Sequence, residues 1–225
     1  MFETVLVAVF TYNEEKNISA VLKKICKKFR NVIVVDNNSD DNTLKKIKKY
    51  PVKIIHHKFN LGKSNSMKSA YDYAKINKFK YLAFIDGDGQ HEVSDLENLC
   101  SKMIEIKKGI VIGYRKNLTN LNFTKRLGTE ILNKIFFIFY KKKILDIQCG
   151  LRAFNTSEKK IKWSSAGLKH YFADAEITCN AVKNKCTISQ IPIRTLPSDN
   201  FKGMNIVLGL YLLVMIVYWR LFNDN

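Results

Sequence analysis

A repeated order of apolar run, polar loop and helical pattern runs through the first half of this sequence. Each apolar run is short and rich in β-branched residues, as expected of strands that are buried in a sheet. The predicted strands are Val5–Phe10, Asn31–Asp36, Val52–His56 and Tyr81–Asp86. The predicted helices between them are Ile18–Ile25, Thr43 to about Lys49, and Ser64 to about Ile76. Because right-handed crossovers join strands that alternate with helices, this order predicts an α/β domain with a mostly parallel sheet.

The fourth predicted strand ends in two carboxylates, Asp86 and Asp88, which are separated and followed by glycines. In open α/β sheets, ligands bind at the edge where the carboxyl ends of the strands lie. Two aspartates and a neighbouring Gln90 amide offer the hard oxygen ligands that Mg²⁺ and Mn²⁺ prefer. An isolated Asp-Gly-Asp-Gly segment is more often a solvated turn, in which aspartate is favoured for its local hydrogen bonds. The residues around the segment must therefore decide between a cation site and a turn.

Polar loops after the other predicted strands provide those surroundings. Tyr12 and Glu14 follow the first strand, and Asp36 ends the second. Because the carboxyl ends of parallel strands meet at one edge of a sheet, we expect these side chains beside Asp86 and Asp88. The sequence therefore favours a divalent-cation site that bridges to a bound phosphate.

The second half of the chain is predicted to complete one domain, which we place at residues 1–200. Its predicted elements are a helix through Leu96, Leu99 and Met103, a strand at Ile110–Ile112, a helix at Thr124–Ile144, a return to the sheet over Asp146–Phe154, a helix that starts within Tyr171–Glu176, and a strand at Ile188–Ile193. Pro192 marks the last as an edge strand. The patch Ile135–Tyr140 beside three lysines fits either a helix in a membrane interface or a core helix with a basic end.

Residues 201–225 are predicted to form a hydrophobic helix. Its segment Met204–Trp219 carries no charge and is flanked by Lys202 and Arg220. At about 1.5 Å per residue it would span about 24 Å, against a hydrocarbon core of about 30 Å. It fits a short or tilted transmembrane anchor, a helix half-sunk in one leaflet, or a helix buried against the domain or a second subunit. We expect membrane contact, because the run is apolar all round and bounded by cations.

The charge balance narrows the partners of this chain. Its 38 basic and 20 acidic residues give a net charge of +18, which suggests a polyanionic partner or an anionic membrane surface. Only six of the basic residues are arginine, so most of the excess is lysine on solvated helix faces. A nucleic-acid-binding module is the non-enzymatic alternative, but no aromatic-basic RNA motif or zinc finger is visible, and we predict no nucleic acid partner. Five cysteines without a C-x-x-C pair indicate reduced thiols and a cytosolic compartment.

The loop motifs, in their order, resemble those of the family 2 glycosyltransferases of the GT-A fold, and most of all the dolichol-phosphate mannose synthases and related polyprenyl-phosphate glycosyltransferases. The segments that carry the resemblance are Tyr12–Glu14, Val34–Thr43, Asn60–Lys63, Asp86–His91, Gly113–Arg115, Lys125–Arg126 and Asp146–Phe154. It covers about residues 4–194. The continuation Gln90-His91 after the acid pair is typical of the polyprenyl-phosphate branch. The resemblance implies a Rossmann-like GT-A sheet flanked by helices.

The resemblance also implies an activity. It is that of an inverting, metal-dependent hexosyltransferase, which moves a sugar from GDP-mannose or a UDP-sugar to a dolichyl or undecaprenyl phosphate at the cytoplasmic face of a membrane. The implied nucleotide-sugar-binding residues are Tyr12, Glu14, Asp36, Asp86, Asp88 and Arg115. The implied ligands of Mg²⁺ or Mn²⁺ are Asp86, Asp88 and Gln90. The implied catalytic residues are Asp88, Arg115 and Arg126, the two arginines facing phosphate oxygens.

Other assignments implied by the resemblance are weaker. The lipid phosphate is assigned to Arg126, Arg194 and Lys202, while Asp174 and Glu176 match a partly acidic family position. The chain departs from the family pattern at Phe10-Thr11, where a proline-containing turn is usual, and at Asn37, where a second acid is usual. Asn38 and Asn42 replace glycines, and asparagine also tolerates left-handed turns.

Several alternatives remain beside this assignment. A GT-A enzyme with a saccharide acceptor would share the same donor motifs, and a catalytically dead relative would scaffold a membrane complex, although Asp86, Asp88 and Arg115 are intact. The Asp86–Gly89 segment also resembles the D-x-D-G loop of haloacid-dehalogenase phosphatases, but there it follows the first strand rather than the fourth. The sequence leaves open whether the chain forms a homo-oligomer.

Overall fold

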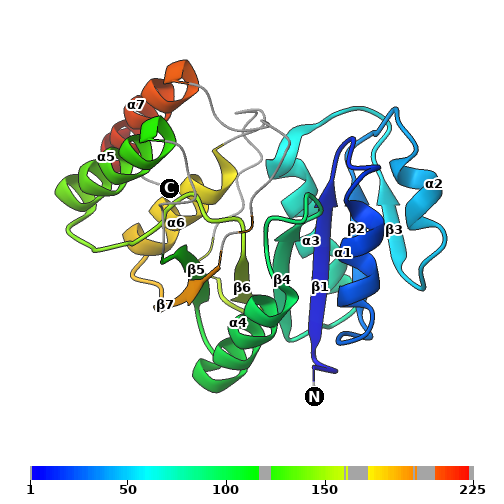
Figure 1. Ribbon diagram of the computed structural model, residues 1–225. Helices are drawn as coiled ribbons and strands as arrows, with labels where there is room; N and C mark the ends of the chain where they lie inside the picture. Colours follow the sequence, from blue (N-terminus) through cyan, green and yellow to red (C-terminus); the bar gives the residue numbers. More distant parts are fainter. Residues whose placement is uncertain are drawn as a thin grey trace.

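A mixed sheet flanked by helices forms the body of the protein, whose structure is a computed structural model (Figure 1). It describes residues 2–116, 123–159, 161, 172–194, 196 and 206–222. In these residues the sheet has seven strands in the order β3-β2-β1-β4-β6-β5-β7. The strands are β1 Val5–Thr11, β2 Val32–Asp36, β3 Lys53–His56, β4 Tyr81–Asp86, β5 Ile110–Arg115, β6 Arg152–Asn155 and β7 Ile188–Ile193.

Six of these strands run in one direction. β1 pairs in parallel with β2 and β4, and β2 pairs in parallel with β3. β6 is antiparallel to both β4 and β5, so β5 and its parallel partner β7 run the same way as β4. The predicted mostly parallel sheet is confirmed, and Pro192 lies on an edge strand as expected.

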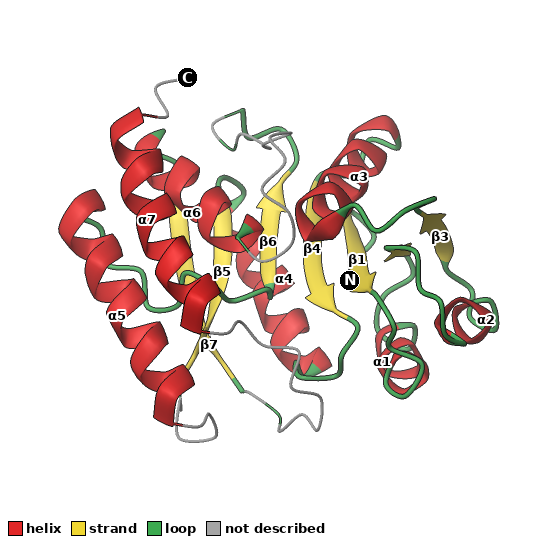
Figure 2. Ribbon diagram, turned by 90° about the horizontal axis from the view of Figure 1, so that it is seen from above, coloured by secondary structure: helices red, strands yellow, loops and turns green. Residues whose placement is uncertain are grey.

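Helices cover both faces of this sheet. Figure 2 shows α1 and α4 on one face and α3 and α6 on the other, with α5 and α7 packed beside α6. The helices are α1 Ile18–Ile25, α2 Thr43–Ile47, α3 Gly62–Ile76, α4 Val93–Ile106, α5 Phe123–Tyr140, α6 Ala173–Lys183 and α7 Ile206–Phe222. α5 stops before the predicted end at Ile144, because Lys141 takes the left-handed φ of 53° and a helix does not continue through that conformation.

The core divides into two clusters of buried apolar side chains. The larger lies on the sheet, where every residue of β1 is buried and the Phe84 ring contacts Phe10 and Phe154 at centroid distances of 4.9 and 4.8 Å. Continuous apolar strands are what a sheet covered on both faces requires. The smaller cluster joins α5, α6 and α7.

The C-terminal helix α7 is half embedded in this smaller cluster. Leu212, Met215, Ile216 and Trp219 are buried against α5 and α6, and the Tyr140 hydroxyl donates to the Ile216 carbonyl at 3.2 Å. Its other side exposes the apolar residues Val207, Leu210, Tyr211, Val214, Tyr218, Leu221 and Phe222. No helix within the described ranges is both long enough and apolar enough to span a membrane.

The apolar patch of α5 is likewise divided between core and surface. Phe136 and Tyr140 are buried and stack at a centroid distance of 4.5 Å, whereas the Phe137 and Ile138 side chains are exposed. The buried side fits the interpretation as a core helix, whereas membrane contact of the exposed side stays a prediction.

Packing of α7 on the domain predicts unequal effects of two substitutions. Ile216→Ala should lower the free energy of unfolding by about 2–5 kcal/mol, because it leaves a cavity between α5 and α7. Val214→Ala, on the exposed side of the same helix, should change it by less than about 0.5 kcal/mol. Urea unfolding followed by circular dichroism measures both, and equal effects would contradict the packing.

Candidate active site

The loops after β1, β2 and β4 meet at the carboxyl edge of the sheet. Thr11 is in register with Asp36, and Phe10 with Asp86. The Gly87 N–H donates to the Phe10 carbonyl at 2.8 Å, and a Cβ on Gly87 would lie only 3.0 Å from that oxygen. A glycine between the two aspartates therefore allows the β1 and β4 loops to touch.

Hydrogen bonds hold the loop after β1 to the loop after β2. The Asn13 N–H donates to Ser39 Oγ at 2.9 Å, and the Glu14 N–H donates to Thr43 Oγ1 at 2.8 Å. The Glu14 carboxylate is buried and accepts from Asn17 Nδ2 at 2.8 Å. Tyr12 is 40% exposed. The predicted nucleoside-binding residues Tyr12 and Glu14 thus lie on a rigid loop beside Asp36.

Asp36 is fully buried and its carboxylate is surrounded by donors. It accepts from Ser39 Oγ at 2.5 Å, from the Ser39 N–H at 3.2 Å and from His56 Nδ1 at 2.8 Å. The His56 side chain is 41% exposed. His56 ends β3 in register with Asp36, and sequence analysis missed it because only strand pairing shows that the two residues are neighbours.

Asn37, where the family usually has an acid, bridges two loops. Its Nδ2 donates to Asn60 Oδ1 at 2.7 Å, and its Oδ1 accepts from the Leu61 N–H at 2.9 Å and lies 3.0 Å from His57 Nδ1. An amide can donate and accept at once, whereas a carboxylate only accepts. Burial lowers the pKa of His57, which favours the neutral ring. The departure at Asn37 is therefore part of the hydrogen-bonding of this edge.

Asn38 and Asn42, which stand where the family usually has glycine, differ in backbone conformation. Asn38 takes the left-handed φ of 66°, which asparagine tolerates better than most residues. Asn42 has φ −77°, so its position needs no glycine.

The acid pair lies in a crowded and poorly solvated place. The Gln90 N–H donates to Asp88 Oδ1 at 3.0 Å. Burial, with the nearby carboxylates of Asp86 and Glu14, raises the pKa of Asp88 to about 6. A carboxylate whose ionised form is disfavoured in this way gains from a cation beside it, and the oxygen ligands suit Mg²⁺ or Mn²⁺. Among the described residues, no group of three or more His, Cys, Asp or Glu side chains could hold a metal ion.

Lys63 contacts the first acid of the pair from the start of α3. Its Nζ lies 2.9 Å from Asp86 Oδ1 and 3.0 Å from Asp86 Oδ2, and also 3.0 Å from Asp174 Oδ2 on α6. Burial alone would raise the pKa of Asp86, but the Lys63 ammonium, together with His91 and Arg152, outweighs burial and the pKa is lowered. The Asn60–Lys63 motif contained this residue, yet nothing in the sequence showed which carboxylates it meets.

Arg152 continues the same chain of charges into the core. It is fully buried, with Nε 3.2 Å from Asp174 Oδ1. Its guanidinium also donates to the carbonyls of Cys149 at 2.7 Å and Ile147 at 2.8 Å, and to Thr178 Oγ1 at 2.7 Å. Arg152 thereby fixes the loop before β6 to α6, and places Asp174, left outside the predicted site, within reach of Lys63.

The predicted arginines lie in different surroundings. Arg115 ends β5 and makes a bidentate pair with the buried Asp146, with Nε–Oδ2 at 2.6 Å and Nη2–Oδ1 at 3.0 Å. Arg126 is exposed on α5 and pairs with Glu130 at 3.1 Å. Both arginines lie in segments that resemble the family motifs. Of the two, Arg115 is held by a buried carboxylate, whereas Arg126 pairs at the surface.

Arg194 binds the start of α4. Its N–H donates to Asp95 Oδ2 at 2.8 Å and its Nη2 to Ser94 Oγ at 2.6 Å. The Leu196 N–H donates to the Gln90 carbonyl at 3.0 Å, so this segment lies against the acid-pair loop. Lys202 and the Lys125 side chain lie outside the described residues. The roles assigned to the predicted site residues stay predictions.

Comparison with known proteins supplies the family. Glycosyl transferase family 2 matches residues 6–159, which include β1, β2, β4 and the acid pair. The chain belongs to this family.

Relatives and solved structures agree with that assignment. This glycosyltransferase is 30% identical over 226 residues to UDP-N-acetylglucosamine–dolichyl-phosphate N-acetylglucosaminyltransferase of Methanococcus voltae, covering 88% of each chain. It is 26% identical over 223 residues to dolichyl-phosphate beta-glucosyltransferase of Dictyostelium discoideum, covering 87% of this chain and 67% of that one.

The fold is that of glucosyl-3-phosphoglycerate synthase from Mycobacterium tuberculosis, solved in complex with Mn²⁺, uridine diphosphate and phosphoglyceric acid. The TM-score is 0.73 at 12% identity, and the match covers 96% of this chain and 78% of that one. The predicted GT-A fold is confirmed.

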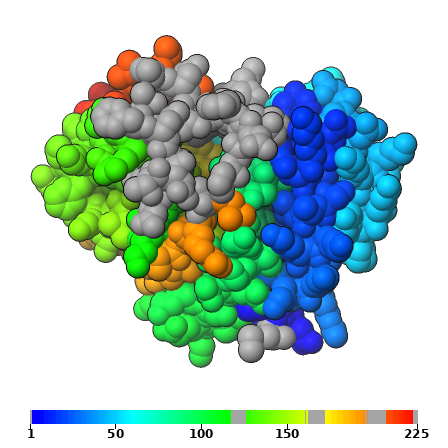
Figure 3. All heavy atoms as spheres, viewed as in Figure 1, coloured from blue at the N-terminus to red at the C-terminus, as the bar shows by residue number. Residues whose placement is uncertain are grey.

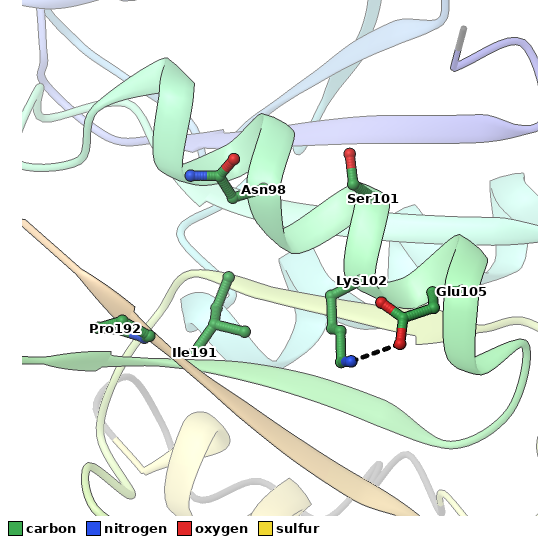
Figure 4. A pocket seen from close by; sticks show the side chains of 6 residues that line it. All are labelled: Asn98, Ser101, Lys102, Glu105, Ile191 and Pro192. Atoms are coloured by element: carbon green, nitrogen blue, oxygen red, sulfur yellow. Dashed lines mark hydrogen bonds and ion pairs between the residues drawn. The ribbon is translucent and has the colours of Figure 1, made fainter.

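A separate hollow of the glycosyltransferase lies between α4 and β7. It is lined by Asn98, Ser101, Lys102, Glu105, Ile191 and Pro192 (Figure 4). In the space-filling view, the atoms of β7 lie next to those of α4 at the surface (Figure 3). The hollow contains none of the predicted site residues, and its two charged groups, Lys102 and Glu105, pair with each other at 2.6 Å.

The bridging role of Asn37 predicts a cost for restoring the acid of the family. Asn37→Asp should destabilise the glycosyltransferase by about 1–3 kcal/mol, because a carboxylate would face the Asn60 oxygen and the neighbouring Asp36. Asn38→Gly, the matched change toward the family pattern, should cost less than about 1 kcal/mol, because glycine accepts this φ freely. Thermal unfolding at pH 7.5 compares the two, and a neutral Asn37→Asp would contradict the bridge.

Proposed function

We propose that this glycosyltransferase transfers one sugar from a nucleotide sugar to a polyprenyl phosphate, with inversion at the anomeric carbon and with Mg²⁺ or Mn²⁺. The observation that carries the proposal is the meeting of the Asp86–Asp88 pair with the Tyr12, Glu14 and Asp36 loops at one sheet edge. The names of the relatives from Methanococcus voltae and Dictyostelium discoideum, both dolichyl-phosphate enzymes, support the acceptor class.

The residues of the chain divide the work between donor and acceptor. The loop that carries Tyr12 and Glu14 would hold the nucleoside, with His56 as the exposed partner of buried Asp36. Asp86 and Asp88, with Gln90, would hold the metal ion. A divalent cation bound there supplies positive charge that stabilises the leaving nucleoside diphosphate.

The acceptor needs positioning more than deprotonation. A phosphate monoester is already an anion at neutral pH, so it attacks without a strong general base. Arg115, held by Asp146, presents a guanidinium whose position is fixed before any phosphate arrives. Guanidinium suits phosphate because its donors match two oxygens at once. Arg126 and Arg194 are the further candidates for the lipid phosphate.

The acid pair gives the direct test of this function. Asp88→Asn should lower sugar transfer by about 10²–10³-fold, because one oxygen ligand and one negative charge at the metal site are lost. Asp72→Asn, on the exposed face of α3, is the matched control and should leave transfer unchanged. The assay follows labelled sugar from UDP-N-acetylglucosamine, UDP-glucose and GDP-mannose into polyprenyl phosphate with Mn²⁺ or Mg²⁺. Transfer that is unaffected by Asp88→Asn, or absent with every donor, contradicts the proposal.

We further propose that the exposed side of α7 contacts the cytoplasmic face of a membrane. Seven apolar residues of α7 are exposed on the side away from the cluster with α5 and α6. The neighbouring helix α5 also exposes apolar side chains, those of Leu127, Ile131, Phe137 and Ile138. A helix with one embedded and one exposed apolar side suits an interfacial position near the lipid acceptor.

Membrane contact through α7 predicts a loss of vesicle binding. Val214→Glu should weaken binding to anionic phospholipid vesicles by about tenfold or more, because a charge replaces a side chain that would enter the acyl boundary. Ile76→Glu makes the same change at an exposed apolar residue at the end of α3 and should have little effect. Vesicle co-sedimentation measures both, and equal binding of the two variants would exclude α7 as the contact.

A further inference from the structure

Lys63 contacts both carboxylate oxygens of Asp86, which are the atoms that would bind a metal ion. Both Asp86 oxygens lie within 3.0 Å of its Nζ, and Asp174 Oδ2 is a third acceptor at 3.0 Å. An ammonium has three N–H donors, so these contacts use its hydrogen-bonding capacity. The Lys63 side chain is only 22% exposed.

Gly150 encloses this ion pair from the loop before β6. A Cβ on Gly150 would collide with Asp86 Oδ2 and would lie 2.9 Å from Lys63 Nζ. The loop cannot easily withdraw, because the Arg152 guanidinium binds the neighbouring Cys149 carbonyl at 2.7 Å. The Lys63–Asp86 contact is therefore built into the fold, unlike an exposed lysine pair at the surface.

Asp86 and Asp88 therefore differ in whether a cation already contacts their oxygens. Asp86 has a cation on both oxygens, whereas Asp88 makes no ion pair within the described part of the chain. A divalent cation that arrives alone meets one available carboxylate and the repulsion of the Lys63 ammonium a few ångströms away. A diphosphate reverses this balance, because its negative charges attract both the divalent cation and Lys63.

We propose that Lys63 is a positioning residue that makes binding of the divalent cation conditional on the donor diphosphate. The ammonium neutralises and orients Asp86 before any cation binds, so that the cation and the nucleoside diphosphate bind together rather than one after the other. The inference rests on the proposed function, since it assumes that Asp86 and Asp88 hold the cation.

The test is the affinity for Mn²⁺ alone and with UDP or GDP, measured from the electron paramagnetic resonance signal of free Mn²⁺. The wild-type chain of residues 1–225 should bind Mn²⁺ at least tenfold more tightly with the matching nucleoside diphosphate. Lys63→Met should raise the affinity for Mn²⁺ alone by about tenfold, because the repelling charge is gone and Asp86 is released. The increase in Mn²⁺ affinity that the nucleoside diphosphate causes should therefore be smaller in Lys63→Met than in the wild type. Lys68→Met, on the same helix and paired only at the surface with Asp72, is the matched control and should behave as wild type.

The measured Mn²⁺ affinities distinguish a role of Lys63 in the order of binding from a purely structural role. A structural lysine predicts unchanged or weaker Mn²⁺ binding in folded Lys63→Met, and that result overturns the inference. If Lys63→Met does not fold by circular dichroism, Lys63→Gln decides. Its neutral amide can still donate to Asp86 but carries no repelling charge, so it should also raise the affinity for Mn²⁺ alone. No gain in that variant overturns the inference. Wild type that binds no Mn²⁺ even with UDP and GDP overturns the proposed function, and this inference with it.

Discussion

A row of alternating charges, half-buried at Asp86 and Lys63 and buried at Asp174 and Arg152, connects elements of this glycosyltransferase that are distant in the chain. It runs from Asp86 on β4 through Lys63 on α3 and Asp174 on α6 to Arg152 on β6. Removing the buried Asp174 or Arg152 would leave its partner uncompensated, which costs about 3–5 kcal/mol for a buried ion pair. The row therefore fixes the positions of four elements relative to one another, and with them the position of Asp86, the first acid of the Asp86–Asp88 pair.

Hydrogen bonds between neighbouring loops likewise fix the carboxyl ends of β1 and β2. The β1 loop is held to the β2 loop through Ser39 and Thr43, and the β2 loop to the start of α3 through Asn37 and Asn60. Most of these contacts join a backbone N–H to a side-chain oxygen, so they fix the main chain itself. A rigid edge of this kind holds a donor without the entropic cost of ordering loops on binding.

The helices α5, α6 and α7 are held together by apolar contacts and not by the polar contacts that join the loops. They pack through Phe136, Cys179, Leu212 and Ile216, and they leave apolar surface of α5 and α7 exposed. This places the exposed apolar surface on the helices outside the sheet. Donor chemistry is then separated from the surface that we propose to meet the lipid, while both belong to one folded unit.

The sequence by itself determined the strands, the mostly parallel sheet and the convergence of Tyr12, Glu14, Asp36 and the acid pair on one edge, because apolar periodicity and the position of loops after strands are local properties. It did not determine the antiparallel insertion of β6, which depends on pairing across the sheet. Nor did it show that Asp36 is covered by His56, that Asp146 holds Arg115, or that Lys63 lies between Asp86 and Asp174. Those contacts join residues distant in the chain, and charge pairing between them follows from the tertiary fold, since the sequence gives no distance between side chains on different elements.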